Sequence, residues 1–182
     1  MQTFTVPTRD QVPENNQAIF DNLQKSLGFV PNLYATFGHS KNALGTYLAL
    51  QNAPSSLSKK EREVINLVVS QVNDCRYCQA AHTAIGKMNG FTDEQILDIR
   101  NAEVTFDPKF AALAQFVKET TARKGRPGPA AVNAFFDAGY TNEQLVDVIM
   151  VIGDKIISNY LHGVTQIPID FPAAPVLEPL EA

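Results

Sequence analysis

Helix-start and helix-stop signals recur along the whole chain, and they constrain its fold more than any other feature. Ser58 with Glu61 and Thr92 with Gln95 each have the spacing of a capping box, in which a hydroxyl group at the helix start is followed three residues later by Glu or Gln. No segment shows the bounded alternation of apolar and polar residues that predicts a strand. The sequence therefore predicts an all-α protein with about two-thirds of its residues in helices, against a usual share of about one-third.

Proline, glycine and capping residues also predict where the individual helices begin and end. A short segment follows Pro31, and the proline-rich tail from Ile167 is expected to be extended. Asp74 is expected to cap the helix that starts at Cys75, and Gly163 to stop the last helix. In chain order, we expect helices between Pro13 and Gly28, over residues 41–52 after a cap at Ser40, from Ser58 to about Val72, from Cys75 to Gly90, from Thr92 onward, from Asp107-Pro108 to Lys124, from Pro129 to about Ala138, and from Thr141 to about His162.

The length of the chain, 182 residues, is enough for one domain with a full hydrophobic core. We expect a single helical domain over residues 1–182, with a core helix pair at about 57–90, C-terminal helices over 93–163 and an extended tail over 164–182. Two segments, 90–99 and 139–148, share a pattern of Gly, aromatic, Thr, Glu-Gln, aliphatic and Asp. This echo fits either the reuse of a good helix start or a duplicated helical unit.

The charge and the apolar segments of the chain exclude several classes of partner. The net charge of −4 argues against nucleic acid as the main partner, because phosphate binding needs a basic face. The first residues lack the apolar core of a signal peptide, and the longest apolar run, around Leu145 to Ile152, is too short and too charged to span a membrane. We therefore expect a cytoplasmic protein without nucleic-acid or membrane partners. In that compartment a close cysteine pair is more often catalytic or metal-binding than a permanent disulfide.

Both cysteines of the chain, Cys75 and Cys78, lie three residues apart, and His82 follows four residues after the second. On one helix these three side chains fall within a sector of about 60°, so they share a face. Cys75 lies in the first turn, where free N–H groups and the helix dipole favour a thiolate. Glu63 belongs to the preceding helix, and it can approach only if the chain at Asn73-Asp74 folds that helix back beside this one.

Several kinds of site can use such a pair. A c-type haem site requires a histidine directly after the second cysteine, where this chain has Gln79, and a thioredoxin-like site requires a preceding strand, which is not predicted. A zinc site formed by Cys75, Cys78, His82 and a carboxylate is chemically possible, although no second ligand pair follows at the usual spacing. Thiol redox catalysis, with carboxylate and imidazole as a proton relay, and two inert buried cysteines also remain open.

The motif of Glu63, eleven residues, Cys75-Arg-Tyr-Cys78, three residues and His82 resembles the signature of the alkylhydroperoxidase D-like family, also called the carboxymuconolactone decarboxylase superfamily. The segment LSKKEREVINLVVSQVNDCRYCQAAHT looks like the core helix pair of this family. LGFVPNLYATFGHS upstream and the tail containing DFP resemble its longer, peroxidase-related branch, so the resemblance covers most of the chain. It implies an all-helical fold that assembles as a homotrimer or homohexamer, with the active site near a subunit interface.

The resemblance also implies a role for each residue of the motif. Cys78 corresponds to the peroxidatic nucleophile and Cys75 to the resolving cysteine, although the position of Cys75 at the helix start favours it as the more acidic thiol. His82 and Glu63 match the proton-relay positions of the family. Tyr77 stands where the best-known hydroperoxidases carry a histidine, which leaves these four positions intact.

The function implied is that of a thiol-dependent alkyl hydroperoxide reductase. It would take a hydroperoxide substrate and an external dithiol or protein reductant, and it would require no cofactor and no metal. The cysteine pair argues against lactone decarboxylation, because the decarboxylases of the superfamily work without it. Two alternatives remain: a disulfide-exchange adaptor or sensor on the same fold, and a zinc-stabilised structural protein.

Overall fold

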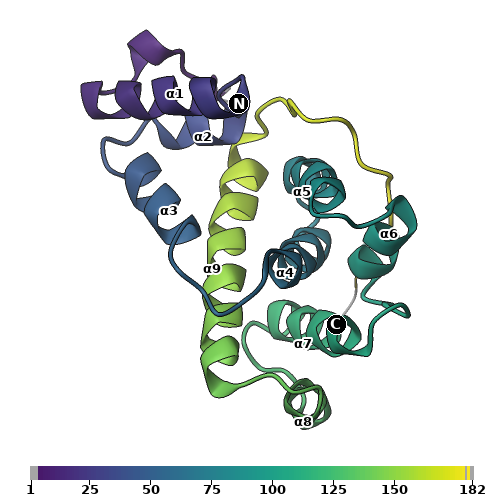
Figure 1. Cartoon of the computed structure of the whole chain (residues 1–182). Coiled ribbons are helices and arrows are strands. Elements are labelled where there is room, and N and C mark those ends of the chain that lie inside the picture. Colours follow the sequence, from purple (N-terminus) through teal and green to yellow (C-terminus); the bar gives the residue numbers. More distant parts are fainter. Residues whose placement is uncertain (1–3, 179, 181–182) are drawn as a thin grey trace. The chain divides into compact units, whose positions relative to one another are not determined.

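The computed structural model describes residues 4–178 and 180, which form nine α-helices and one short 3-10 helix but no strand (Figure 1). The prediction of an all-α protein is therefore confirmed. No helix within the described residues is long and apolar enough to cross a membrane. The elements are η1 (Arg9–Gln11), α1 (Glu14–Leu27), α2 (Asn32–Phe37), α3 (Ala43–Gln51), α4 (Lys59–Val72), α5 (Arg76–Met88), α6 (Asp93–Asn101), α7 (Pro108–Ala122), α8 (Pro129–Asp137) and α9 (Asn142–Thr165).

The chain divides into two compact units. The first unit consists of the described part of residues 1–54 together with 160–170, and the second consists of 55–159 together with the described part of 171–182. Helix α9 contributes its last residues to the first unit and the rest to the second. The expected single domain over 1–182 and the expected homotrimer or homohexamer both stay predictions.

A buried asparagine organises the first unit. The side chain of Asn16 on α1 is fully buried, and its amide nitrogen donates to the carbonyl oxygens of Gly38 (3.0 Å) and Ser40 (2.9 Å). These bonds satisfy carbonyl groups of the chain that follows α2. The rings of Phe37 and Tyr47 stack beside them at a centroid distance of 4.3 Å.

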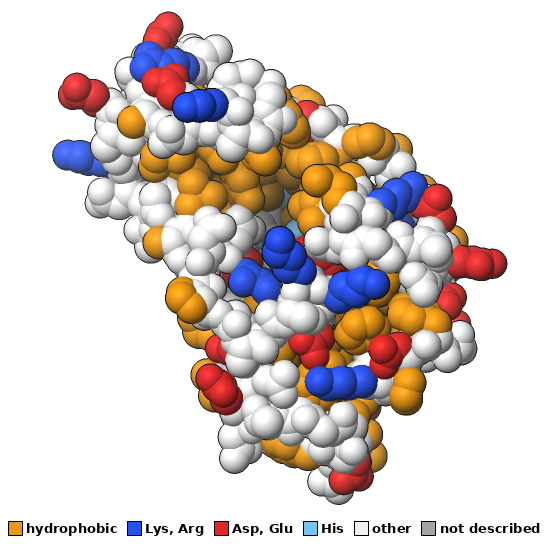
Figure 2. All heavy atoms as spheres, in the orientation of Figure 1, with side chains coloured by type: hydrophobic (Ala, Val, Ile, Leu, Met, Phe, Trp, Pro, Cys, Tyr) orange, Lys and Arg blue, Asp and Glu red, His pale blue; other side chains and the backbone are white. Residues whose placement is uncertain are grey.

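Helix α4 is the centre of the second unit. It packs against α5, α6 and α7, and its residues Val64, Ile65, Leu67 and Val68 are fully buried, as the apolar pattern predicts. Burial of each such side chain contributes about 1.5–3 kcal/mol to folding. The first turn of α4 carries the exposed Lys59 and Lys60, and the partly exposed Arg62 follows. Figure 2 shows basic side chains gathered over the place where Figure 1 shows α4.

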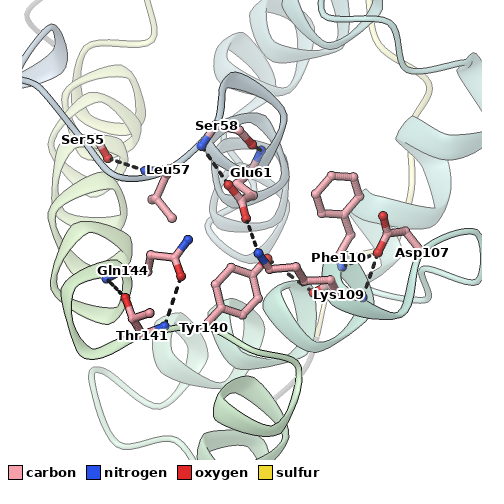
Figure 3. Close-up of polar contacts among 10 residues, drawn as sticks. All are labelled: Ser55, Leu57, Ser58, Glu61, Asp107, Lys109, Phe110, Tyr140, Thr141 and Gln144. Atoms are coloured by element: carbon pink, nitrogen blue, oxygen red, sulfur yellow. Dashed lines mark hydrogen bonds and ion pairs between the residues drawn. The ribbon is translucent and has the colours of Figure 1, made fainter.

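The start of α4 confirms the predicted capping box and joins it to two other elements (Figure 3). The Ser58 amide donates to the Glu61 carboxylate at 2.8 Å, and the Glu61 amide donates to the Ser58 hydroxyl at 3.2 Å. The other oxygen of Glu61 lies 3.3 Å from Lys109 Nζ on α7, which in turn lies 4.5 Å from the centre of the Tyr140 ring. Burial and the nearby Glu61 carboxylate raise the pKa of the Tyr140 hydroxyl. The cap thus fixes α4 against α7 and against the chain that leads into α9.

Three predicted helix boundaries are wrong. Helix α3 begins at Ala43 with Asn42 as its cap, not at residue 41 after a cap at Ser40. Helix α5 begins at Arg76, and its cap is Cys75, while Asp74 adopts a left-handed conformation with φ 47°. Asp74 therefore makes the reversal between the helices, and its carboxylate pairs with Arg76 at 3.1 Å instead of capping. Gly163 does not stop α9, which continues to Thr165 and ends where Gln166 turns left-handed with φ 49°. A glycine lowers helix propensity, but it ends a helix only where the backbone turns left-handed.

The tail over the described residues 166–178 is extended, as expected, and buried side chains hold part of it. Arg100 on α6 is fully buried and donates to the carbonyl oxygen of Pro175 at 2.8 Å. Its guanidinium also donates to the side-chain oxygens of Gln71 and Gln79, and Gln71 donates to the carbonyl of Glu178 at 3.0 Å. We call Gln71, Gln79 and Arg100 the tail anchor. The tail is therefore fixed to α4, α5 and α6 of the same unit.

Candidate active site

Four side chains expected to act together lie on the adjacent helices α4 and α5. Glu63 comes from α4, Cys75 is the cap of α5, and Cys78 and His82 follow on α5 itself. The left-handed turn at Asp74 folds α5 back against α4, which is the arrangement that the sequence required to bring Glu63 near. All four side chains are buried, with exposed fractions of 2–7 %. We call these four residues together with Lys155 the thiol site.

The two thiols contact each other. Their sulfur atoms lie 2.7 Å apart, and both cysteines are in the free form. The backbone amide of Cys78 donates to the sulfur of Cys75 at 3.3 Å, so Cys75 takes the capping role that Ser or Asp usually fills. A disulfide has a sulfur–sulfur distance of about 2.05 Å, so only a small movement is needed to close one here.

The environment shifts the pKa values of the two thiols in opposite directions. The hydrogen bond from the Cys75 thiol lowers the pKa of Cys78, and the charge of Lys155 together with Asn159 and Ser158 lowers it further, against the effect of burial. The same hydrogen bond to Cys78, together with burial, raises the pKa of Cys75. A donor held toward a thiolate stabilises the charged form, and the donor itself then keeps its proton. These directions favour Cys78 as the thiol that ionises first, despite the position of Cys75 at the helix start.

Glu63 and His82 form a second pair. His82 Nδ1 lies 2.9 Å from one carboxylate oxygen of Glu63, and Asn66 donates to the other at 3.0 Å. Burial alone would raise the pKa of Glu63, but the interaction with His82 and the bond from Asn66 outweigh it and lower that pKa. Burial, and then the charge of Lys155, lower the pKa of His82. These directions favour a carboxylate that accepts from the Nδ1–H of a neutral imidazole, which leaves Nε2 able to accept a proton.

Lys155 on α9 links the two pairs, and the sequence interpretation missed it. Its side chain is buried, and its charge contributes to the lowered pKa values of Glu63, Cys78 and His82. At Cys75 the same charge opposes the net rise of the pKa. Seventy-seven residues separate Lys155 from Cys78, so no local spacing places it there. The available signal was a lysine within the long apolar helix, because a charge on a buried helix face needs a reason.

The structure brings the expected residues together as two pairs, not as one chain of contacts. No hydrogen bond joins His82 to either thiol within the described residues, although His82 and Cys78 share a helix face. Tyr77, between the cysteines, is buried and packs edge-on against Phe171 of the tail at a centroid distance of 5.6 Å. Across the described residues, no three His, Cys, Asp or Glu side chains are grouped so that they could hold a metal ion. The zinc alternative therefore has no geometric support there.

Comparisons with known proteins bear on the family. Residues 39–119, which include the whole motif, match the model of the carboxymuconolactone decarboxylase family. This match and the peroxidase-related structures described below support the predicted place of the chain in the alkylhydroperoxidase D-like, or carboxymuconolactone decarboxylase, superfamily. The helical fold that this superfamily implies is confirmed.

Two solved structures and one curated protein show how far the similarity extends. A peroxidase-related protein from Silicibacter sp. is 26 % identical, with a TM-score of 0.81 over 91 % of this chain and 90 % of that one. A peroxidase-related protein with an alkylhydroperoxidase AhpD core, from Ralstonia eutropha, is 22 % identical, with a TM-score of 0.82 over 92 % and 91 %. The Bacillus subtilis protein YdfG is 28 % identical over 100 residues, which are 54 % of this chain and 68 % of YdfG.

Proposed function

We propose that this protein is a thiol-dependent alkyl hydroperoxide reductase. Cys78 is the nucleophile, Cys75 the resolving thiol, and His82 with Glu63 the proton relay. The observation that carries the proposal is the pair of contacting thiols with opposite pKa shifts. A peroxidatic cysteine must be a thiolate at neutral pH, whereas a resolving cysteine must keep its proton until the first step is complete.

The first step consumes the peroxide. The Cys78 proton passes to His82 Nε2 through one intervening water or substrate hydroxyl, since no hydrogen bond joins the two side chains directly. The thiolate attacks the terminal oxygen of the hydroperoxide, so a sulfur–oxygen bond forms and the oxygen–oxygen bond breaks. The leaving alkoxide takes the proton from His82, and Glu63 stabilises the transient imidazolium. Cys78 becomes a sulfenic acid, oxidised by two electrons, and the hydroperoxide becomes an alcohol.

The second half of the cycle restores the thiols. The Cys75 sulfur attacks the Cys78 sulfenic acid, which releases water and closes the disulfide. An external dithiol or protein reductant then exchanges with this disulfide and leaves as its own disulfide. The sum is one hydroperoxide and one dithiol converted to one alcohol, one water and one disulfide. Every electron comes from the dithiol, so the scheme needs no further co-reactant.

The direct test is a thiol count on the pre-reduced protein before and after one equivalent of cumene hydroperoxide, with peroxide loss followed in parallel. Because both thiols are buried, the count is made after rapid acid quenching and unfolding in guanidinium. We expect two thiols to be lost for each peroxide consumed, and dithiothreitol to restore them. Thiols that stay reduced while the peroxide persists contradict the proposal.

The two cysteine variants are matched controls for each other. Cys78→Ser is expected to lose peroxide consumption, by at least about a thousandfold, because the nucleophile is removed. Cys75→Ser is expected to consume one equivalent and stop as a sulfenic acid that dimedone traps on Cys78. The reverse pattern would exchange the two roles. A reversible disulfide that forms with oxidised glutathione but not with peroxide would instead identify the disulfide-exchange adaptor or sensor.

A further inference from the structure

Three buried polar residues of α9 act on Cys78, which lies on α5. Lys155, Ser158 and Asn159 have exposed fractions of 2, 1 and 3 %, and all three favour the thiolate form of Cys78. Their spacing of three and four residues places them on one face of the helix. The charged and titratable groups that act on Cys78 are Cys75 from α5 and Lys155 from α9. The three α9 residues differ in the interaction that each can offer to the Cys78 sulfur.

Among the buried side-chain atoms of these three residues, only Asn159 Nδ2 lacks a hydrogen-bond partner within the described residues. The Ser158 hydroxyl already donates to the backbone carbonyl of Lys155 at 2.9 Å. The Lys155 ammonium supplies charge, but a point charge on a flexible stem gives little direction. Asn159 differs, because its amide nitrogen Nδ2 is buried and has no hydrogen-bond acceptor within the described residues. A buried amide donor without an acceptor lowers the free energy of unfolding, so native proteins rarely keep one without a functional role.

The orientation of the Asn159 amide is fixed from its other end. Its oxygen Oδ1 accepts a hydrogen bond from Asn73 Nδ2 at 2.9 Å. Asn73 caps the end of α4, two residues before Cys75, so it is held by the same turn that places the thiols. An amide whose oxygen is engaged in this way must present its NH₂ group elsewhere, and here the side chain acts on Cys78.

We propose that Asn159, oriented by Asn73, is a positioning residue whose amide donates to the Cys78 thiolate and gains its missing acceptor when that thiol ionises. The inference rests on the proposed function only in its choice of Cys78 as the reactive thiol. Ionisation of a thiol can be measured without any peroxide. In the thiol form Cys78 is a weak acceptor and the donor lacks a partner, while in the thiolate form the donor is satisfied. The donor without an acceptor therefore destabilises the neutral thiol form relative to the thiolate form.

The test is the pH titration of thiolate absorbance at 240 nm in the reduced protein, checked by the pH dependence of the iodoacetamide reaction rate. Asn159→Asp replaces the donor with a carboxylate of the same shape, so we expect the thiolate fraction at neutral pH to fall about tenfold. Asn159→Ala only removes the donor, and a fall of about threefold is expected. Asn73→Ala removes the bond that orients the Asn159 amide. We expect its thiolate fraction at neutral pH to lie between those of wild type and Asn159→Ala. The double variant Asn73→Ala/Asn159→Ala should match Asn159→Ala alone, because Asn73 acts through Asn159.

Thr120→Val is the matched control, since Thr120 on α7 is also buried with a hydroxyl that has no partner. It removes an orphaned polar group outside the thiol site, and the thiolate titration is expected to stay at the wild-type position. Wild-type titration in both Asn159→Asp and Asn159→Ala overturns the proposal, as does additivity in the double variant. If Asn159→Asp does not fold, the alanine variants decide alone. A protein that shows the expected titrations but consumes no peroxide supports this inference and contradicts only the proposed function.

Discussion

The thiol site and the tail anchor are both buried polar clusters of the second unit, and both use α5, yet they are built in opposite ways. In the tail anchor, the Arg100 guanidinium is met by side-chain oxygens of Gln71 and Gln79 and by a backbone carbonyl. No buried polar side-chain atom of these three residues lacks a partner. Around the thiol site, Asn66 Oδ1, Asp154 Oδ1 and Asn159 Nδ2 have no hydrogen-bond partner among the described residues.

The difference separates a structural cluster from a reactive one. A fully satisfied network rigidifies the fold and has nothing to gain from a change of charge. A cluster with orphaned donors and acceptors is costly in the resting state, and it is justified where a charge appears during a reaction. Burial lowers the pKa of Arg100, yet its partners are neutral oxygens that do not titrate near neutral pH. The thiol site instead contains four groups with shifted pKa values.

The largest expected effect on stability is in the tail anchor. Arg100→Met keeps the length of the apolar stem but leaves the oxygens of Gln71, Gln79 and Pro175 without their donor. We expect a loss of about 3 kcal/mol in the free energy of unfolding, measured by urea denaturation. The thiolate titration of Cys78 is expected to stay unchanged. Arg123→Met, at a half-exposed arginine paired with Glu119, is the control and should cost less than about 0.5 kcal/mol.

If Arg100→Met moves the thiolate titration while Arg123→Met does not, the two clusters are not independent. Gln79 would be the connecting residue, because it follows Cys78 on α5 and bonds to Arg100 at 3.1 Å. Loss of less than about 1 kcal/mol in Arg100→Met would contradict the structural role itself.

The second expected effect is on the reaction. Glu63→Gln keeps the shape of the side chain but removes the charge that stabilises protonated His82. We expect peroxide consumption at neutral pH to fall about a hundredfold, with the pH–rate profile displaced. Glu61→Gln on the same helix is the control, because the Glu61 carboxylate caps α4 and pairs with Lys109, outside the thiol site. An unchanged profile in Glu63→Gln removes Glu63 from the relay.

The sequence predicted the parts of the fold that depend on local signals. The capping boxes at Ser58 and Thr92 form as expected, because each needs only residues within one turn. The predicted start of α5 was wrong, because Asp74 and Cys75 are both possible caps. The choice between them depends on the reversal of the chain toward α4. The end of α9 was wrong because Gly163 lies within a helix whose last turns belong to a packed unit, where tertiary context overrides propensity.

In the candidate site, too, the sequence predicted what depends on local signals and not what depends on tertiary packing. The shared face of Cys75, Cys78 and His82 follows from the helical period, and the approach of Glu63 follows from one tight turn. Lys155 and Asn159 could not be placed, because their positions depend on how α9 packs in the second unit. The sequence also could not predict which of the two thiols is the more acidic. The helix start favours Cys75, but the hydrogen bond between the thiols and the groups of α9 favour Cys78.

The third prediction concerns the pH dependence of stability. The pKa of His82 is lower in the folded protein than the value of about 6.5 expected in the unfolded chain. As the pH falls below about 6.5, the unfolded chain therefore takes up a proton that the folded protein refuses, and stability falls by up to about 1.4 kcal/mol per pH unit until the folded pKa is reached. The lowered pKa of Glu63 acts in the same direction, but only below about pH 4.3. The lowered pKa of Cys78 also acts in this direction below about pH 8.5. Unfolding in urea between pH 7 and pH 5 thus reports protonation of the histidines and of the Cys78 thiolate.

Variants of two histidines separate the contributions in this range. Burial also lowers the pKa of His162 in the first unit, so the wild-type slope contains both groups. His82→Gln and His162→Gln are each expected to remove one part of the slope, and the part that remains in both variants is assigned to Cys78. The tail anchor contributes nothing. A wild-type slope in His82→Gln would show that the imidazole is not held neutral.

The smallest expected effect tests whether the tail itself belongs to the thiol site. Phe171 of the tail packs edge-on against Tyr77, which stands between the two cysteines. Phe136 of α8 makes a similar edge contact with Phe135 at 5.4 Å and has no part in the tail, so it offers a matched control. We expect Phe171→Ala and Phe136→Ala each to lower the free energy of unfolding by about 1 kcal/mol, and neither to move the thiolate titration.

A displaced titration in Phe171→Ala alone would contradict the separation of the two clusters. Tyr77 would then transmit the position of the tail to the thiols, and the tail would belong to the thiol site as well as to the tail anchor. In that case Arg100→Met should displace the titration in the same direction, because it releases the same tail at Pro175. The two variants together therefore distinguish a tail that only stabilises α5 from one that also sets the acidity of Cys78.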